Sequence, residues 1–375
     1  MAHELYNRGI LRAVVETTPN PSTPEVVANT DVHYCPPEST FVASNPTVIQ
    51  REGISAFRSG HRPVGGGFEP SWSHVSEVDF VTIADGTTRP VCHPWLVACG
   101  FVPAYAANVD YVGPDVVASG GDNDKILTYT PKTFDASTES SIRINYTHLQ
   151  GDRTEGLLED IRGARCDWEL SLEMGMRWGL VCKDGKGIGT DRPTKVSSPS
   201  TQDSYSDKTI AVVLGQQYAL VALAVASDVV YGGGTEASPT RAAHLRKFSL
   251  SGNAPVVVDK GPGGTGGVLR ARHNVGPAMT GALTIEMVTW PDDWDLYEFI
   301  KQGTVMRLAL NQPSPTSGDY IALTLHFVIA SATPTVLDGL TVVDLAIASA
   351  FPESSSDDGG LRPDEPFKLQ WITQA

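Results

Sequence analysis

The sequence predicts a mainly β fold with short helices, and the main evidence is a regular alternation of apolar and polar side chains. The alternation is clearest over 166–174, where every second residue is apolar. The polar positions between them are Asp167, Glu169, Ser171 and Glu173. Successive side chains of a strand point to opposite faces, so this stretch predicts a half-buried strand. After Gly175 the same phase resumes through Cys182, which predicts a long hairpin with one apolar face and one polar face.

Further short segments with strand-like composition recur along the chain, separated by glycine, proline and polar turn residues. We expect strands at 10–15, 77–83, 125–130, 141–148, 247–250, 256–259, 268–272, 282–288, 304–310, 320–330, 341–351 and 367–372, with one or two more within 209–230. Their number and short length favour a mainly β fold with short helices.

Two segments carry helix signals instead. The apolar segment 94–99 begins at a proline and is followed by Gly100, which is the usual asymmetry of a short helix. The segment 291–302 begins with Pro291, has three aspartates in its first turn and has Lys301 in its last turn. Acidic residues near the start and a cation near the end both suit the helix dipole.

Composition divides the chain of 375 residues into two predicted domains. The first is 1–185, with an extended N-terminal arm at about 1–50 and a long glycine- and arginine-containing loop at 51–70. A linker is expected at 186–208, because this stretch is rich in Gly, Ser, Thr, Pro and charge and has little to bury. The second domain is 209–375.

The two predicted domains have a similar order of elements, which suggests a duplicated domain. The match pairs 77–83 with 282–288, 94–99 with 291–302, 125–130 with 304–310, 141–148 with 320–330, 166–174 with 341–351, and 178–183 with 367–372.

Charge and cysteine content restrict the function classes. The net charge of −15 argues against binding nucleic acid through a basic patch. No apolar run is long enough for a membrane span, so no membrane insertion is expected. The N-terminal sequence lacks the pattern of a signal peptide. The five cysteines are irregularly spaced, which predicts reduced thiols in a cytosol.

Motifs for catalysis, cofactors and metals are not apparent in the sequence. HExxH, CxxC and GxSxG do not occur. Cys92, His93 and Cys99 could be imagined as a metal site, but their spacing is not that of paired zinc ligands. The glycine-rich 261–267 does not join a strand to a helix, as a phosphate-binding loop would. We therefore expect a protein that is not an enzyme and that has no catalytic, cofactor or metal site.

Several segments, taken in order, resemble a known family. They are 96–101 (LVACGF), 129–131 (YTP), 162–185 (RGARCDWELSLEMGMRWGLVCKDG), 248–253 (FSLSGN), 282–287, 303–304 (GT), 338–340 (DGL) and 357–360 (DDGG). This order is similar to that of the bacteriophage major tail tube proteins of siphophages, and the likeness covers most of 75–375. One departure is that Cys166 stands where the family's GARG pattern has its second glycine.

The resemblance implies a fold and a function. It implies two tandem tail-tube-type β-sandwich or barrel domains, whose long hairpins join across subunits into a channel-lining β-barrel. A chain with two such domains would form a trimeric ring with pseudo-sixfold symmetry. Rings would stack into the hollow tube that conducts the genome during ejection. The implied location is the virion tail, after assembly in the bacterial host cytoplasm.

The implied partners are further copies of the chain, the tape measure protein, the tail terminator and tail-tip proteins, with phage DNA passing through the lumen without specific binding. The polar face Asp167, Glu169, Ser171 and Glu173 is the candidate lumen lining, since carboxylates repel phosphates. Candidate contacts between subunits or rings are Arg51, Arg58, Arg62, Phe68, Asp357 and Asp358.

Two alternatives remain open. A tail-tip or baseplate hub ring would reuse the same domain at one ring per particle. A β-sandwich module that binds carbohydrate or a receptor would present exposed aromatic side chains in a concave site. The tryptophans of this chain lie mainly on the alternating or helical faces, which favours a structural role.

Overall fold

The fold was analysed in a computed structural model, in which antiparallel strands dominate as the alternation predicts. The structure describes residues 9–18, 27, 32–33, 35–43, 46–49, 64–109, 124–131, 140–149, 155–173, 178–190, 192–197, 220–225, 241–242, 245–265, 268–274, 278–286, 296–314, 319–350 and 367–374. Within these ranges, no helix has the length and apolar character that crossing a membrane requires.

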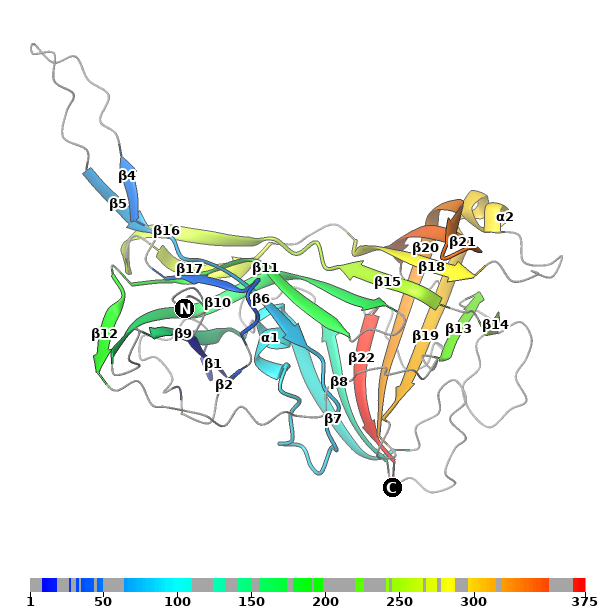
Figure 1. The fold of residues 1–375 in the computed structure, drawn as a ribbon, viewed down its shortest axis with the longest axis horizontal. Coiled ribbons are helices and arrows are strands. Elements are labelled where there is room, and N and C mark those ends of the chain that lie inside the picture. Colours follow the sequence, from blue (N-terminus) through cyan, green and yellow to red (C-terminus); the bar gives the residue numbers. More distant parts are fainter. Residues whose placement is uncertain are drawn as a thin grey trace, which may run out of the picture.

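The described residues of the first half form twelve strands and one helix (Figure 1). They are β1 (Gly9–Val15), β2 (Val32–His33), β3 (Thr40–Val42), β4 (Pro46–Ile49), β5 (Val64–Phe68), β6 (Ser71–Glu77), α1 (His93–Ala98), β7 (Phe101–Val109), β8 (Asp124–Pro131), β9 (Ile142–Leu149), β10 (Glu155–Glu173), β11 (Gly179–Ile188) and β12 (Thr194–Ser197).

In the second half, the part of the chain that the structure describes forms ten strands and one helix. They are β13 (Leu220–Val225), β14 (Arg241–Ala242), β15 (Leu245–Ser251), β16 (Val256–Thr265), β17 (Val268–His273), β18 (Thr280–Glu286), α2 (Leu296–Gln302), β19 (Val305–Pro313), β20 (Asp319–Leu337), β21 (Leu340–Ser349) and β22 (Phe367–Thr373).

The two halves have the same strand pairing. In the first, the neighbours run β2, β1, β9, β10, β11, β6, β3. In the second, they run β14, β13, β19, β20, β21, β18, β15, in the same chain order and with antiparallel pairing throughout. The strand that follows each unit in the chain also has the same partner in both halves. Strand β12 pairs with the start of β10, and β22 pairs with the start of β20.

The remaining elements repeat as well. Each half has a separate two-stranded hairpin at the same place in its order, β4–β5 and β16–β17. In chain order, each has its helix between the fourth and fifth strands of the unit, which are β6 and β9 in the first half and β18 and β19 in the second. Among the residues that the structure describes, only the β7–β8 hairpin has no counterpart, and it extends the sheet by pairing β8 with β22. This pairing corrects the strand correspondence expected from sequence: β9 matches β19, β10 matches β20 and β11 matches β21.

The two longest strands, β10 and β20, each have partners that change along their length. The first part of β10 pairs with β9 and β12, and its last part pairs with β11 and β15. The change coincides with a register shift around Gly163, whose φ of 56° is a left-handed conformation that glycine adopts without strain. In β20 a register shift at Ala330 separates the part paired with β19 and β22 from the part paired with β21 alone.

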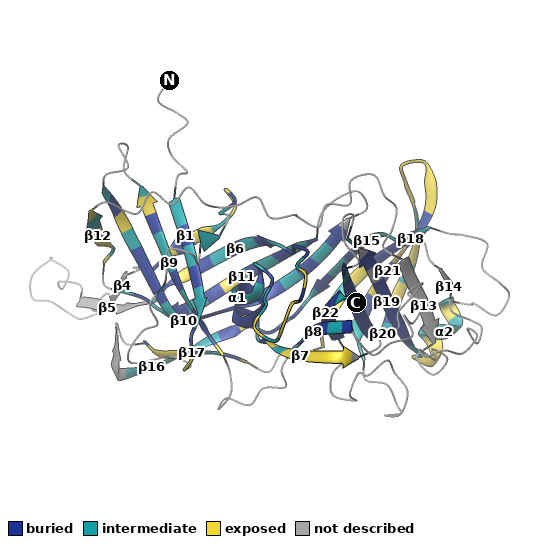
Figure 2. Cartoon of the chain, turned by 90° about the horizontal axis from the view of Figure 1, so that it is seen from below, coloured by how far each residue is buried: buried dark blue, intermediate teal, exposed yellow. Residues whose placement is uncertain are grey.

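Most of the core lies on the apolar side of the joined sheets. Trp168, Leu170 and Leu172 of β10 are buried, as the alternation predicts. Their neighbours Phe248 and Leu250 on β15 are buried in the same cluster. Figure 2 shows the buried strands running through both halves, with exposed residues gathered at hairpin tips and edges. The halves therefore share one continuous core.

Several expected elements are confirmed with shifted limits, and two expectations are wrong. The strand expected at 77–83 ends at Glu77, because the following residues bond irregularly: the Ile83 N–H donates to the Thr373 hydroxyl. The pattern came from the alternating Val78 and Phe80, which are buried without a strand. Strand β7 was not expected from sequence, because it contains Pro103. Among the described residues it pairs only with β8, and an edge strand of this kind tolerates proline.

The expected linker is also partly sheet. Residues 186–188 continue β11, and Thr194–Ser197 form β12, which pairs with the start of β10. The Lys195 ammonium on β12 lies 2.7 Å from the Glu155 carboxylate on β10. A polar composition did not exclude these strands, because an edge strand on the surface needs little to bury. Helix α2 begins at Leu296, and the expected residues before it, 291–295, lie outside the described ranges.

Candidate functional site

The candidate functional surface is the polar side of a sheet that crosses both halves, in the order β6, β11, β10, β15, β18, β21 (Figure 1). We call this side the composite face. Adjacent positions on the six strands form rows of small or polar side chains. One row is Val75, Val181, Glu169, Ser251, Thr280 and Ala348. The next row is Glu77, Gly179, Ser171, Ser249, Ala282 and Ala346.

The predicted lumen residues do not all have the same environment. Glu169 and Ser171 are partly exposed on the composite face. Asp167 is only 8 % exposed, and its carboxylate accepts hydrogen bonds from the main-chain N–H groups of Trp168 (2.8 Å) and Ala254 (3.0 Å). Asp167 therefore links β10 to the segment between β15 and β16. Glu173 is the last residue of β10, and its side chain lies outside the described residues.

The composite face also carries a cation that the alternation did not reveal. Lys183 of β11 lies opposite Asp167, with its ammonium 3.6 Å from the Glu169 carboxylate and donating to the Ser251 hydroxyl at 2.9 Å. Both charged side chains are partly exposed, so their attraction is weak. The face is therefore polar and of mixed charge around Glu169.

The predicted contact residues lie mostly outside the described ranges. These are Arg51, Arg58, Arg62, Asp357 and Asp358. Phe68 is the last residue of β5, in the hairpin that stands away from the body of the molecule in Figure 1, and its side chain is likewise outside the description.

The joint between the halves is the pairing of β10 with β15. Five residues of β10, from Glu169 to Glu173, face Ser251 to Lys247. The Gly252 N–H extends the contact by donating to the Trp168 carbonyl at 2.9 Å. A first-half strand thus pairs with the edge strand of the second-half unit.

The counterparts of these two strands are β20 and β3, and they carry no such pairing within the described residues. Past Val328, β20 pairs only with β21 there. Val336 is 70 % exposed, and Leu337 and Leu340 beside it are 40 % and 44 % exposed. Strand β3 pairs only with β6 among the described strands, and Val42 is 41 % exposed. Within the described part of the chain, both ends of the repeat therefore have strand edges without a strand partner, beside exposed apolar side chains.

No family model matches this chain, and no curated protein is significantly similar to it.

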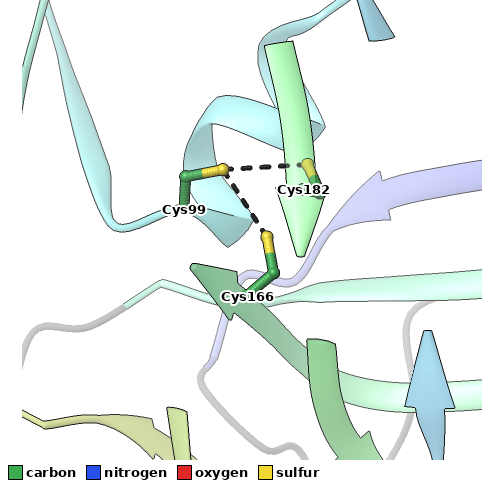
Figure 3. A group of neighbouring side chains, drawn as sticks. All are labelled: Cys99, Cys166 and Cys182. Atoms are coloured by element: carbon green, nitrogen blue, oxygen red, sulfur yellow. Dashed lines mark hydrogen bonds between the residues drawn. The ribbon is translucent and has the colours of Figure 1, made fainter. Parts of the chain in front are cut away.

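A second feature is a group of three buried thiols, which we call the thiol cluster. It consists of Cys99 at the end of α1, Cys166 on β10 and Cys182 on β11 (Figure 3). The Cys99 sulfur lies 3.5 Å from that of Cys166 and 3.7 Å from that of Cys182, and all three sulfurs lie within 4.8 Å of one another. No spacing rule links positions so far apart in sequence, which is why sequence analysis missed the cluster.

The group considered from sequence, Cys92, His93 and Cys99, does not come together. His93 Nδ1 lies 2.8 Å from the Tyr129 hydroxyl. Burial, with the nearby Arg89 guanidinium, lowers the pKa of His93 to about 4, so this side chain is neutral at pH 7. Cys92 is buried but is not one of the clustered thiols.

Proposed function

We propose that this chain is a structural virion protein, the major tail tube subunit of a long-tailed bacteriophage, assembling into rings that stack around a DNA channel. The observation that carries the proposal is the β10–β15 joint together with the repeat. Because the halves share one strand order, the contact that joins them inside one chain can be made again between chains.

The expected contact between chains follows from the repeat. Strand β20 corresponds to β10 and β3 corresponds to β15, so the last part of β20 in one copy would pair with β3 of the next. The open edge of β20 and its exposed Val336 support this reading, since an unpaired apolar edge favours strand addition. The contact is head-to-tail, and a head-to-tail contact forms a ring when its rotation closes. Three copies with two repeats each give the pseudo-sixfold ring implied by the resemblance.

The composite face would then line the channel. Its rows consist of Ser, Thr, Ala, Gly, Val and Glu, with Lys183 as the described cation, and a face of short side chains leaves an open bore. Glu169, Glu77 and the net charge of −15 disfavour tight contact with DNA phosphates. The tape measure protein, tail terminator and tail-tip proteins would be the further partners, in a virion assembled in the host cytoplasm.

The test is electron microscopy of the purified full-length chain, together with its mass in solution. We expect annular particles or hollow tubes with three chains per ring. Val336→Lys should leave a folded monomer, because a charge would be placed in the new strand pair. Leu157→Lys is the control, since Leu157 is 38 % exposed and lies in the first part of β10, which pairs with β9 and β12. Assembly that is unaffected by Val336→Lys would reject the β20–β3 contact.

A further inference from the structure

We propose that the thiol cluster, Cys99, Cys166 and Cys182, is a binding site for one thiophilic metal ion, with Zn²⁺ as the ion that fills it in the cell. The site is independent of the assembly proposed above. It lies in the interior of the first half, between α1 and the β10–β11 hairpin (Figure 3).

The sulfur separations fit a metal with little movement. Zinc–thiolate bonds of about 2.3 Å in tetrahedral geometry place two sulfurs roughly 3.8 Å apart. The observed separations of 3.5 Å and 3.7 Å are close to this value. The sulfurs come from three different elements and converge on one point, which packing of small apolar residues does not require.

The backbone positions of Cys99 and Cys166 are well supported. The Cys99 N–H donates to the Trp95 carbonyl at 3.0 Å, which fixes it at the end of α1. Gly100 follows with φ of 86°, turning the chain directly into β7. His273 Nε2 donates to the Cys166 carbonyl at 3.0 Å, so a strand of the second half holds this position. Preorganised ligands on regular elements are the arrangement that metal binding needs.

The chemistry of the ligands selects the class of metal. Thiolates favour soft or borderline ions such as zinc, and disfavour magnesium and calcium. Each Zn–S bond formed replaces an S–H bond, and the proton goes to water. The described residues supply three ligands, and a water molecule would complete the tetrahedron.

The experiment uses the full-length chain, produced in zinc-supplemented cells and purified in reducing buffer without chelator. Elemental analysis should find about one zinc per chain, as in other structural sites. Unfolding and refolding with Cd²⁺ should produce the ultraviolet sulfur-to-cadmium charge-transfer band. Refolding is included because the sulfurs are buried, so the ion must enter as the chain folds.

Two matched variants locate the site. Cys182→Ser should lose both the zinc and the cadmium band, whereas Cys92→Ser should keep both, because Cys92 is an equally buried thiol outside the cluster. Circular dichroism reports whether each variant is folded. A folded wild-type chain with neither zinc nor a cadmium band would overturn the proposal and leave three packed thiols. Equal metal loss in the two variants would also overturn it.

Discussion

The carboxylate of Glu16, at the end of β1, accepts a hydrogen bond from the main-chain N–H of Gly163 at 3.0 Å, across 147 residues of sequence. Gly163 lies at the register shift of β10, where the strand changes partners. The Ser141 hydroxyl also donates to Glu16. A single buried side chain therefore satisfies the irregular backbone at the bend of the longest strand of the first half.

Replacing Glu16 with Ala should destabilise the chain by about 1–3 kcal/mol, because the Gly163 N–H would be left buried without an acceptor. Glu16→Gln is the control, since the amide oxygen can still accept from Gly163. The free energy of unfolding in urea measures both effects. Equal stability of the Ala variant and the wild type would show that water replaces the carboxylate.

The same pair of variants should reveal a pH dependence. Burial is the largest influence on Glu16 and raises its pKa above the ordinary 4.5, although the hydrogen bonds from Ser141 and Gly163 act in the opposite direction. An acid with a raised pKa binds more protons in the folded chain than in the unfolded chain. The free energy of unfolding therefore falls as pH rises from 4.5 through the folded pKa. Unfolding at a series of pH values should show this fall in the wild type and its absence in Glu16→Gln.

Gly252→Ala should weaken the joint between the halves. A Cβ added at Gly252 would lie 2.2 Å from Nε1 of the buried Trp168, which packs against Phe101 and Phe367. Relieving this overlap costs about 1–3 kcal/mol. Gly179→Ala on β11 is the matched control, because its nearest neighbour is the movable Ser171 hydroxyl at 3.2 Å. Thermal unfolding compares the two, and a similar midpoint for both would contradict the expected role of Gly252.

The strand pattern of the sheet could be predicted from sequence because alternation is a local property. The polar and apolar phases of 166–173 correspond to the two faces of β10. The change of partners at Gly163 could not be predicted, since it depends on Glu16 and on two strands distant in sequence. An alternation with a period of two predicts which face of the sheet each side chain lies on, but it does not identify the neighbouring strand.

The candidate sites show the same limit. Asp167 belongs to the same set of alternating polar positions as Glu169, yet its side chain is buried. The main-chain N–H of Ala254, in the second half, donates a hydrogen bond to its carboxylate. Sequence analysis could not anticipate a contact that depends on how the halves join. The thiol cluster likewise depends on tertiary structure, since 67 residues separate Cys99 from Cys166. A useful signal was that Cys166 and Cys182 share the apolar phase of one hairpin.

The β20–β3 contact can be tested by cross-linking. If β3 repeats the register of β15, position 42 of one copy lies beside position 333 of the next, on the same face. The double variant Val42→Cys, Thr333→Cys should form covalent oligomers under mild oxidation, because paired strand positions bring Cβ atoms within disulfide range. Denaturing gel electrophoresis without reductant measures the product, and reductant should return it to the monomer.

The single cysteine variants distinguish the type of contact. In a head-to-tail contact neither Val42→Cys nor Thr333→Cys can bond to its own copy in the neighbour, so each should remain monomeric on the gel. A dimer formed by either single variant would indicate a two-fold contact instead. The native Cys92, Cys99, Cys166 and Cys182 are buried and should not interfere, and the partly exposed Cys35 is replaced by Ser in every variant.

The channel proposal predicts a change in DNA binding when the charge of the composite face is reversed. Glu169→Lys places one new cation per chain on that face, and every ring of an assembled tube then repeats it. Because each neutralised phosphate releases counterions, the assembled variant should bind a short DNA duplex in low salt and lose it as salt rises. Fluorescence anisotropy of the duplex measures this. Glu155→Lys is the control, since Glu155 is a partly exposed carboxylate at the far end of β10, paired with Lys195 outside the composite face. Equal binding by the two variants would mean that the composite face does not line the channel.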